Sequence, residues 1–268
     1  MLAQKAVTLG AAAATLFAVA AASAALQPPP AIKTAGKIVF CSDIEYPPME
    51  SLQGSKPVGA DIDIGAAAAK LMGVKAQFKN VGFDGIIAAL LAKKCDAIIS
   101  AMTDTAQRRK QVDFADYVDV GASIMVDKGN PQHITGLASL AGQAVAVQIG
   151  TTEKDSLSAE NKVLAKEHRK SITIKLFPKD TDAAAALATG KVNAYFADDP
   201  PVGYYVKKSR GKFEVAASKI QAAPEGVATR KGDPLGAAMT KAIAGLYANG
   251  TMKSILARWG LSAIALRK

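Results

Sequence analysis

The residues best suited to chemistry lie at positions 98–114, which read Ile-Ile-Ser-Ala-Met-Thr-Asp-Thr-Ala-Gln-Arg-Arg-Lys-Gln-Val-Asp-Phe. The pattern predicts the end of a buried strand, a turn rich in hydroxyl groups, and a short helix that begins with basic residues. Thr103 and Arg108 would then place a hydroxyl, backbone N–H groups and a guanidinium group at the carboxyl end of a strand, where open α/β sheets bind small ligands. Such a cluster suits an anion, most simply a carboxylate.

Alternating strands and helices are expected to position this stretch. Apolar strands are predicted at 37–41, 75–79 and 96–100, and helices at 61–72 and from Phe83 onward. The second helix carries one apolar face, made of Phe83, Ile86, Ile87, Leu90 and Leu91. This alternation predicts an α/β fold with a parallel sheet between helices.

A second, less apolar α/β block follows. Its predicted elements are strands at 143–148, 172–177 and 192–196, and helices at 182–189 and from Pro200. A strand at 226–229 and helices at 233–248 and 251–259 close the chain. The simplest topology returns this last segment to the first block. We therefore predict lobe I at 37–121 and 226–268 and lobe II at 122–225, with two hinge strands near 121–125 and 221–225.

Residues 1–24 are predicted to be a secretory signal peptide, and residues 25–36 a proline-rich leader. Lys5 is the one charged residue in the first segment, which is apolar at 6–22 and ends in Ala-Ser-Ala, a small-x-small cleavage site. The alternative is a transmembrane helix, but the run is short and alanine-rich, and no basic stop-transfer cluster follows it. No other segment is long and apolar enough to span a membrane, so we expect a soluble periplasmic protein.

The net charge limits the possible partners, and the cysteines bear on the redox state of the protein. A net charge of +10 raises the possibility that the protein binds nucleic acid. The basic residues are spread along the chain, however, and lack interleaved aromatic residues. This pattern predicts a solvated basic surface and no nucleic-acid partner. An oxidising compartment favours a disulfide between the two cysteines, Cys41 and Cys95. If strands 37–41 and 96–100 are parallel, however, the cysteines lie at opposite ends, and this geometry predicts two free thiols.

Several short segments occur in an order that resembles the family 3 periplasmic solute-binding proteins of ABC importers, among them the histidine-, lysine/arginine/ornithine- and glutamine-binding proteins. The segments are Tyr-Pro-Pro-Met-Glu at 46–50, Gly-Ala-Asp-Ile-Asp-Ile at 59–64, Phe-Asp-Gly-Ile-Ile-Ala-Ala-Leu at 83–90, Ala-Met-Thr-Asp-Thr-Ala-Gln-Arg at 101–108, Val-Asp-Phe at 112–114, Gly-Thr-Thr at 150–152, and Asp198. The resemblance covers essentially the whole mature chain. It implies the two-lobed periplasmic binding protein fold of type II, in which each lobe is a mostly parallel sheet flanked by helices and two strands form the hinge.

The resemblance also implies a ligand-binding set. Arg108 matches the arginine that clamps the ligand α-carboxylate through two parallel charge-assisted hydrogen bonds, and Asp198 matches the acid that takes the α-ammonium group. Thr103 and Thr152 would add hydroxyl and backbone N–H groups. Tyr46 and Phe83 match the aromatic pair around the ligand side chain, and Asp43 matches an acid near the end of that side chain. Ala101, Met102 and Thr151 are neighbours of the two threonines.

Each assignment has a structural alternative. Arg108 can be a surface residue, Thr152 a helix cap, Asp198 a solvated acid, and Phe83 part of the core. Two positions depart from the family: Met49 replaces a frequent phenylalanine, and Asp104 replaces an aliphatic residue. Asp104 can pair with Arg108 or favour a more basic ligand.

These features predict a monomeric periplasmic receptor that closes around a polar or cationic L-amino acid and delivers it to an ABC permease in the inner membrane. We expect no enzymatic activity, cofactor or metal ion. The alternative is a periplasmic enzyme on the same scaffold, such as a cyclohexadienyl or arogenate dehydratase, with Asp104 or Asp199 as the general acid. The sequence contains no Gly-x-Ser-x-Gly, His-Glu-x-x-His or Cys-x-x-Cys motif. A signalling or adhesive module on this fold is a third possibility.

Overall fold

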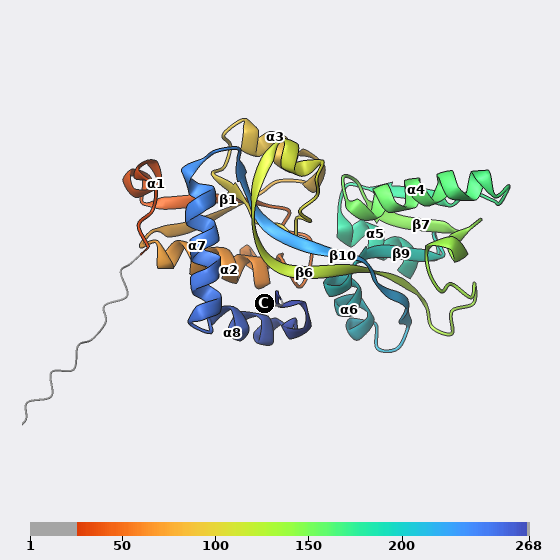
Figure 1. Cartoon of the computed structure of the whole chain (residues 1–268). Helices are drawn as coiled ribbons and strands as arrows, with labels where there is room; N and C mark the ends of the chain where they lie inside the picture. The colour runs from red at the N-terminus through yellow and green to blue at the C-terminus, as the bar shows by residue number, and fades with distance from the viewer. Residues whose placement is uncertain (1–25, 267–268) are drawn as a thin grey trace, which may run out of the picture.

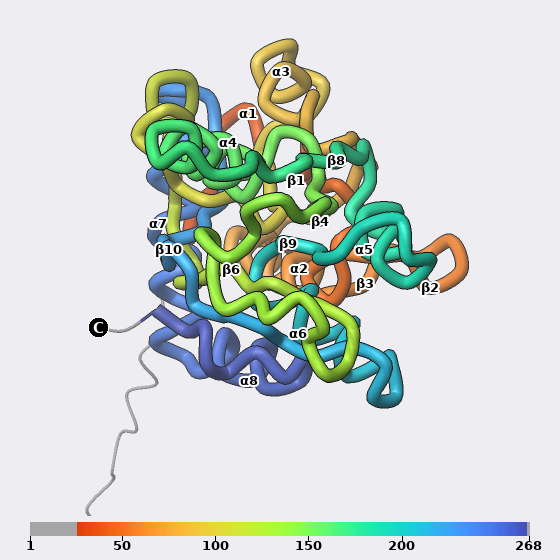
Figure 2. The backbone as a smooth tube through the Cα atoms, turned by 90° about the vertical axis from the view of Figure 1, so that its right-hand side faces the viewer, coloured from red at the N-terminus to blue at the C-terminus, as the bar shows by residue number. Residues whose placement is uncertain are grey.

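Two lobes lie side by side, and two long strands connect them (Figure 1). The computed structural model describes residues 26–266, so the predicted signal peptide at 1–24 lies outside the described residues. Figure 2, turned by 90°, brings the lobe that contains α4, α5 and α6 in front of the other. We refer to the lobe that contains β1 as lobe I and to the lobe that contains β7 as lobe II.

Lobe I is built on three parallel strands. β1 (Lys37–Ser42) lies between β4 (Lys75–Asn80) and β5 (Ala97–Ile98), with Phe40 level with Phe78 on one side and Ala97 on the other. A small hairpin joins β2 (Ser51–Gln53) to β3 (Lys56–Val58). The helices of this lobe are α1 (Pro30–Ala35), α2 (Ala60–Leu71), α3 (Ile86–Leu91), α7 (Pro234–Ala248) and α8 (Thr251–Trp259), with 3₁₀ turns η1 (Phe83–Gly85), η2 (Arg108–Lys110) and η4 (Ser262–Ile264).

Lobe II repeats this pattern with its own parallel strands. β7 (Ala144–Gln148) pairs with β8 (Thr173–Phe177) and with β9 (Ala194–Asp198). Its helices are α4 (Thr152–Lys166), α5 (Asp180–Ala188) and α6 (Asp199–Lys208), with the 3₁₀ turn η3 (Leu137–Leu140). Thr151 caps α4 because its hydroxyl oxygen accepts a hydrogen bond from the Lys154 N–H group.

The strands β6 (Val112–Asp127) and β10 (Phe213–Arg230) run antiparallel through both lobes. They join the two sheets into one ladder with the order β4-β1-β5-β10-β6-β9-β7-β8. The register between them shifts repeatedly from Val215 to Gly226. At Gly121 the two strands come so close that a Cβ atom would lie 2.7 Å from the Lys219 Cα atom, so this position requires glycine.

Each lobe has its own apolar core, and each of the two crossing strands passes from one core into the other. On β6, Val120 packs into the large cluster of lobe I, whereas Ala122 packs into a cluster of lobe II. On β10, Ile220 packs against the lobe II cluster and Val227 belongs to lobe I. Because no buried apolar cluster within residues 26–266 spans both lobes, the strands and the polar contacts between the lobes determine their relative position.

The α/β fold predicted from the sequence is confirmed, with differences at the ends of elements. The predicted strand at 96–100 is only two residues long as β5, and the helix predicted from Phe83 begins as the 3₁₀ turn η1 before α3. The predicted strand at 226–229 is the end of the much longer β10. Part of the predicted leader forms α1, whose Ile32 is buried in the lobe I core. None of the helices within residues 26–266 is long and apolar enough to cross a membrane.

The prediction of two free thiols is wrong, because Cys41 and Cys95 form a disulfide with their Cα atoms 5.7 Å apart. The strands are parallel, as expected, but they do not start at the same level. The short β5 begins beside Phe40, near the end of β1, so that Cys41 pairs with Ile98. The Asp96 N–H group donates to the Val39 carbonyl oxygen at 2.8 Å, and this stagger places Cys95 beside the end of β1.

The disulfide closes a loop with a sequence separation of 54 residues. Replacing both cysteines, as C41A/C95A, should lower the free energy of unfolding by about 4 kcal/mol, because the unfolded chain gains loop entropy. Urea denaturation followed by circular dichroism measures this change. Wild-type protein under reducing conditions is the control, because it loses the disulfide but keeps both cysteine side chains. A decrease in the free energy of unfolding below about 1 kcal/mol in both samples would contradict the prediction.

Candidate functional site

A cavity lies between the lobes, where the ends of strands and the start of α4 face each other. The side chains around it come from both lobes: Asp43, Tyr46, Glu50, Phe83, Ser100, Ala101, Thr103, Arg108, Gln148, Thr151, Thr152, Glu153 and Asp198. The space left between them is about 10 Å³, roughly the room that one water molecule needs. A larger molecule therefore enters only when the lobes separate or these side chains move.

Of the residues that the structure describes, Arg108 is the one basic residue on the cavity wall. The turn before η2 places it, since the Arg108 N–H group donates to the Thr105 hydroxyl oxygen at 3.1 Å. Its Nη1 donates to the Thr103 carbonyl oxygen at 2.8 Å, and its Nη2 reaches lobe II, where it donates to the Gly150 carbonyl oxygen at 3.2 Å. The guanidinium group also lies over the Phe83 ring, 5.4 Å from its centroid. Burial lowers the pKa of Arg108 from its usual value, but an arginine stays charged.

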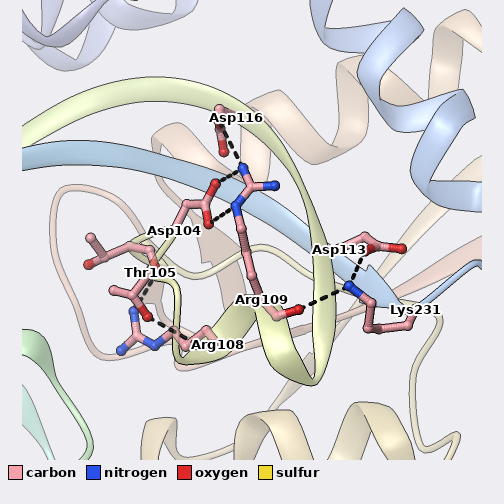
Figure 3. Close-up of polar contacts among 8 residues, drawn as sticks. Asp104, Thr105, Arg108, Arg109, Asp113, Asp116 and Lys231 are labelled. Carbon is pink, nitrogen blue, oxygen red and sulfur yellow. Dashed lines mark hydrogen bonds and ion pairs between the residues drawn. The ribbon is translucent and has the colours of Figure 1, made fainter.

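Arg109, the next residue, points to the other side of the turn (Figure 3). Its Nε donates to Asp104 Oδ1 at 2.6 Å, and its Nη2 pairs with Asp104 Oδ2. Asp116 Oδ2 lies 3.8 Å from the same Nη2. The sequence left open whether Asp104 pairs with Arg108. In the structure Asp104 pairs with Arg109, because the Arg109 side chain lies on the side of the turn that faces away from the cavity. Arg108 therefore has no carboxylate partner on its own loop.

Thr103 of lobe I and Thr152 of lobe II meet beside Arg108, with their hydroxyl oxygens 3.4 Å apart. Thr152 is the first residue of α4. The first N–H groups of a helix have no partner inside the helix and carry partial positive charge. This corner of the cavity therefore combines a guanidinium group, two hydroxyl groups and a helix N-terminus, all of which favour an anion.

Tyr46 and Asp198 connect the lobes on another side of the cavity. The Tyr46 hydroxyl group donates to Asp198 Oδ2 at 2.7 Å, and the Asp198 N–H group donates to the same hydroxyl oxygen at 3.2 Å. Asp198 ends β9 and is 8% exposed. Burial, followed by the negative charges of Glu153 and Glu225, raises the pKa of Asp198 well above its usual range.

Asp43 makes a further contact between the lobes. Gln148 Nε2 donates to Asp43 Oδ2 at 2.6 Å. Burial raises the pKa of Asp43 to about 6, and the hydrogen bond from Gln148 acts in the opposite direction. Nearer the surface, Lys179 Nζ lies 2.7 Å from Glu45 Oε1 and forms an exposed ion pair between the lobes.

A buried polar network supports the floor of the cavity. Ser100 donates from its hydroxyl group to Glu50 Oε1 at 2.7 Å and accepts from the Asp43 N–H group at 2.9 Å. Asp61 accepts from the Ala101 N–H group at 2.7 Å and from the Tyr117 hydroxyl group at 2.8 Å. The Ala101 N–H group is therefore already bonded to a carboxyl group of the protein.

The structure brings nearly all of the predicted binding residues to one cavity. Asp43, Tyr46, Phe83, Ala101, Thr103, Arg108, Thr151, Thr152 and Asp198 lie around it. Met102 does not, because its side chain packs in the apolar cluster that contains Cys41 and Ile86.

Sequence reasoning missed Glu50, Ser100, Gln148 and Glu153. Glu50 ends the Tyr-Pro-Pro-Met-Glu segment, Ser100 lies next to Ala101, Gln148 ends a strand and Glu153 follows Thr152. Their nearness to the predicted positions was the available signal. Among the described residues, no group of three or more histidine, cysteine or acidic residues is arranged to hold a metal ion.

Comparisons with known proteins identify relatives over most of the chain. Residues 38–262 match the bacterial extracellular solute-binding proteins, family 3. The L-cystine-binding protein TcyJ of Escherichia coli K12 is 28% identical over 232 residues, which cover 85% of this chain and 84% of that protein.

Two solved structures are similar in fold and in sequence. An ancestral arginine-binding protein bound to arginine is 35% identical, with a TM-score of 0.77, over 84% of this chain and 98% of that one. The ancestral amino acid-binding protein AncCDT-1, a precursor of cyclohexadienyl dehydratase, is 32% identical, with a TM-score of 0.75, over 85% of this chain and 97% of that one.

The contact between Asp43 and Gln148 predicts a measurable titration. Carbon-13 NMR of the aspartate carboxyl groups should give Asp43 a pKa of about 6. In Gln148→Leu the pKa of Asp43 should rise further, because the ionised form loses a hydrogen bond while the burial remains. Gln77→Leu, on the exposed part of β4, is the control and should leave the pKa of Asp43 unchanged. A lower pKa in Gln148→Leu would contradict this account.

Proposed function

Because the chain belongs to the bacterial extracellular solute-binding proteins of family 3, we propose that it is the periplasmic receptor of an amino-acid ABC importer and that its ligand is a cationic L-amino acid. The lobes separate by bending of β6 and β10 near 121–125 and 221–225 and close again around the ligand. The monomeric closed form then presents both lobes to a permease in the inner membrane.

The observation that carries this proposal is the charge on the cavity wall. One guanidinium group, from Arg108, faces four carboxyl groups, from Asp43, Glu50, Glu153 and Asp198. Buried charges are costly unless they are paired. A zwitterionic amino acid adds no net charge, whereas a cationic one adds a second positive charge, which permits more of these carboxyl groups to ionise. An arginine-like ligand is therefore favoured over a neutral one of the same shape.

The arrangement of these groups suggests how such a ligand lies. The α-carboxylate binds in the corner formed by Arg108, Thr103 and the N-terminus of α4. The α-ammonium group binds Asp198. The side chain extends between the rings of Tyr46 and Phe83 toward Asp43. Phe83 already lies against one guanidinium group, that of Arg108, and its ring face suits a second cation equally well.

Closure follows from differential binding. Arg108, Thr103 and Asp43 belong to one lobe, and Thr152, Glu153 and Asp198 belong to the other. The ligand contacts both sets only when the lobes are closed, so its binding shifts the population toward the closed form.

An enzymatic role has less support. Asp104 and Asp199 were the acids considered for a dehydratase, and neither lines the cavity. Asp104 pairs with Arg109, while Asp199 accepts hydrogen bonds from Ser123 and from the Lys219 N–H group. Incubation with prephenate or arogenate, followed by a search for an aromatic product, tests this alternative.

A thermal-shift screen tests the ligand class. L-Arginine and L-lysine should raise the melting temperature, since a ligand at one hundred times its Kd stabilises the native form by about 2.7 kcal/mol. L-Citrulline, the uncharged analogue of arginine, is the matched control and should bind at least tenfold more weakly by calorimetry. Equal affinity for arginine and citrulline would contradict the cationic class, and no shift with any amino acid would contradict the proposed function.

Arg108 and Arg109 offer a matched pair of variants. Arg108→Ala should weaken ligand binding by about 2–5 kcal/mol, because it leaves the ligand carboxylate buried without its charge partner. Arg108→Lys should restore only part of the loss, since an ammonium group lacks the planar fork. Arg109→Ala should bind like the wild type because its guanidinium group lies outside the cavity. Calorimetry that gave the two alanine variants the same affinity would refute the assignment.

A further inference from the structure

A second cavity adjoins the first one at the crossing strands. One of its walls is formed by β6 and β10, at the stretch that we propose as a hinge: Val120, Ala122, Ile220 and Ala223. Its volume is about 190 Å³, whereas that of the first cavity is about 10 Å³. A protein cavity of about 150 Å³ can hold benzene. The second cavity therefore has room for a group of several heavy atoms.

The two cavities share a wall, which carries the groups to which we assign the backbone of the ligand. Thr103, Thr152, Glu153 and Asp198 line both cavities. In our assignment the α-carboxylate lies against the two threonines and the α-ammonium group against Asp198. A group attached to the α-nitrogen is thus next to the second cavity. The side chain of the ligand points away from it, toward Asp43, which lines only the first cavity.

Backbone contacts hold the lobe I part of the shared wall in place. Thr103 and Glu225 form an isolated antiparallel bridge. Next to it, the Asp104 N–H group donates to the Pro224 carbonyl oxygen at 2.8 Å. The loop that carries Thr103 is therefore attached to β10, and the second cavity lies between two strands and a loop that is bonded to one of them.

The remaining wall of the second cavity is polar but not basic. α4 contributes Ser156, which follows Thr152 by one helical turn and lies on the same face of the helix. The Ser156 hydroxyl group donates to Gln221 Oε1 of β10, so α4 and β10 meet at this edge. Among the described residues that line the cavity, none is basic, whereas Glu153 and Asp198 are acidic. This wall suits an uncharged polar group and disfavours an anion, which would be buried without a charge partner.

We propose that the second cavity is a subsite for a substituent on the α-nitrogen, and that the protein accepts α-amino acids whose α-nitrogen carries an uncharged hydroxyalkyl group. A protonated secondary amine keeps the positive charge and two of the three N–H donors of a primary ammonium group. It can therefore still bind Asp198 while its substituent lies between α4 and the crossing strands. This inference rests on the proposed function, because it uses the assignment of the α-ammonium group to Asp198.

Calorimetry with L-arginine and Nα-(2-hydroxyethyl)-L-arginine tests the subsite. The wild type should bind the substituted ligand at least as tightly as arginine, because each methylene group buried against the apolar wall raises the affinity about fourfold. Nω-(2-hydroxyethyl)-L-arginine carries the same group at the guanidinium end and is the matched isomer. It should bind at least about tenfold more weakly than arginine, because the first cavity has no comparable space for that group.

Ser156→Leu places a larger apolar side chain at the second cavity and changes no residue that we assign to the amino acid itself. It should weaken binding of Nα-(2-hydroxyethyl)-L-arginine by about tenfold to a hundredfold, the usual cost of overpacking. Its affinity for L-arginine should stay that of the wild type. Ser158→Leu is the control, because it makes the same change on α4 at a residue that lines neither cavity. This variant should bind both ligands like the wild type.

The wild type alone can overturn the inference, even where Ser156→Leu fails to fold. Rejection of Nα-(2-hydroxyethyl)-L-arginine by a protein that binds L-arginine does so, as does an equal loss of both ligands in a folded Ser156→Leu variant. Nα-(Carboxymethyl)-L-arginine adds a carboxylate, and equal binding of this ligand and the hydroxyethyl one contradicts the uncharged class. A protein that binds neither L-arginine nor any other amino acid would instead refute the proposed function.

Discussion

The structure depends on hydrogen bonds that buried charged and polar groups make across the boundary between two lobes. Arg108 comes from lobe I and donates to the Gly150 carbonyl oxygen of lobe II, whereas Asp198 comes from lobe II and accepts from the Tyr46 hydroxyl group of lobe I. A buried charge without a partner costs more free energy than most single contacts supply. Closure is therefore favourable only when every charge at the cavity finds a partner. The protein groups alone leave an excess of carboxyl groups, and this excess links the position of the lobes to the chemistry between them.

The scaffold is arranged to bring these groups together while leaving the lobes separate. The apolar core changes between Val120 and Ala122, so little apolar surface holds one lobe to the other. Two crossing strands keep the connection, and Gly121 allows them to approach closely. Within lobe I the arrangement is more rigid: the Cys41–Cys95 disulfide joins β1 to the segment before β5, and Asp61 holds the Ala101 backbone. The lobe I side of the site is thus held together by its own contacts, and in the proposed closure the other side would move with lobe II.

The features that repeat along the sequence could be predicted from it. The features that depend on how neighbouring strands and loops align could not. Periodicity gave the α/β fold and its elements, and ordered motifs gave Arg108, Thr103, Thr152 and Asp198. The disulfide could not be obtained in this way, because it depends on where β5 starts along β1. The partner of Asp104 was equally hidden, since two adjacent arginines point to opposite sides of one turn. Gln148 and Glu153 became visible only when lobe II was placed against lobe I.

If the ligand is the one that we propose, the contact between Tyr46 and Asp198 gives the site a way to discriminate against neutral molecules. In the closed arrangement Asp198 accepts a hydrogen bond from an uncharged phenol at 2.7 Å. A ligand that offers only another neutral donor exchanges one such bond for another and gains little. On the proposed assignment, a ligand that offers an ammonium group brings a full positive charge to Asp198, and a hydrogen bond between opposite charges is stronger than one from a neutral phenol. On this proposal the tyrosine competes with the ligand for Asp198, so selectivity depends on competition inside the site as well as on its shape.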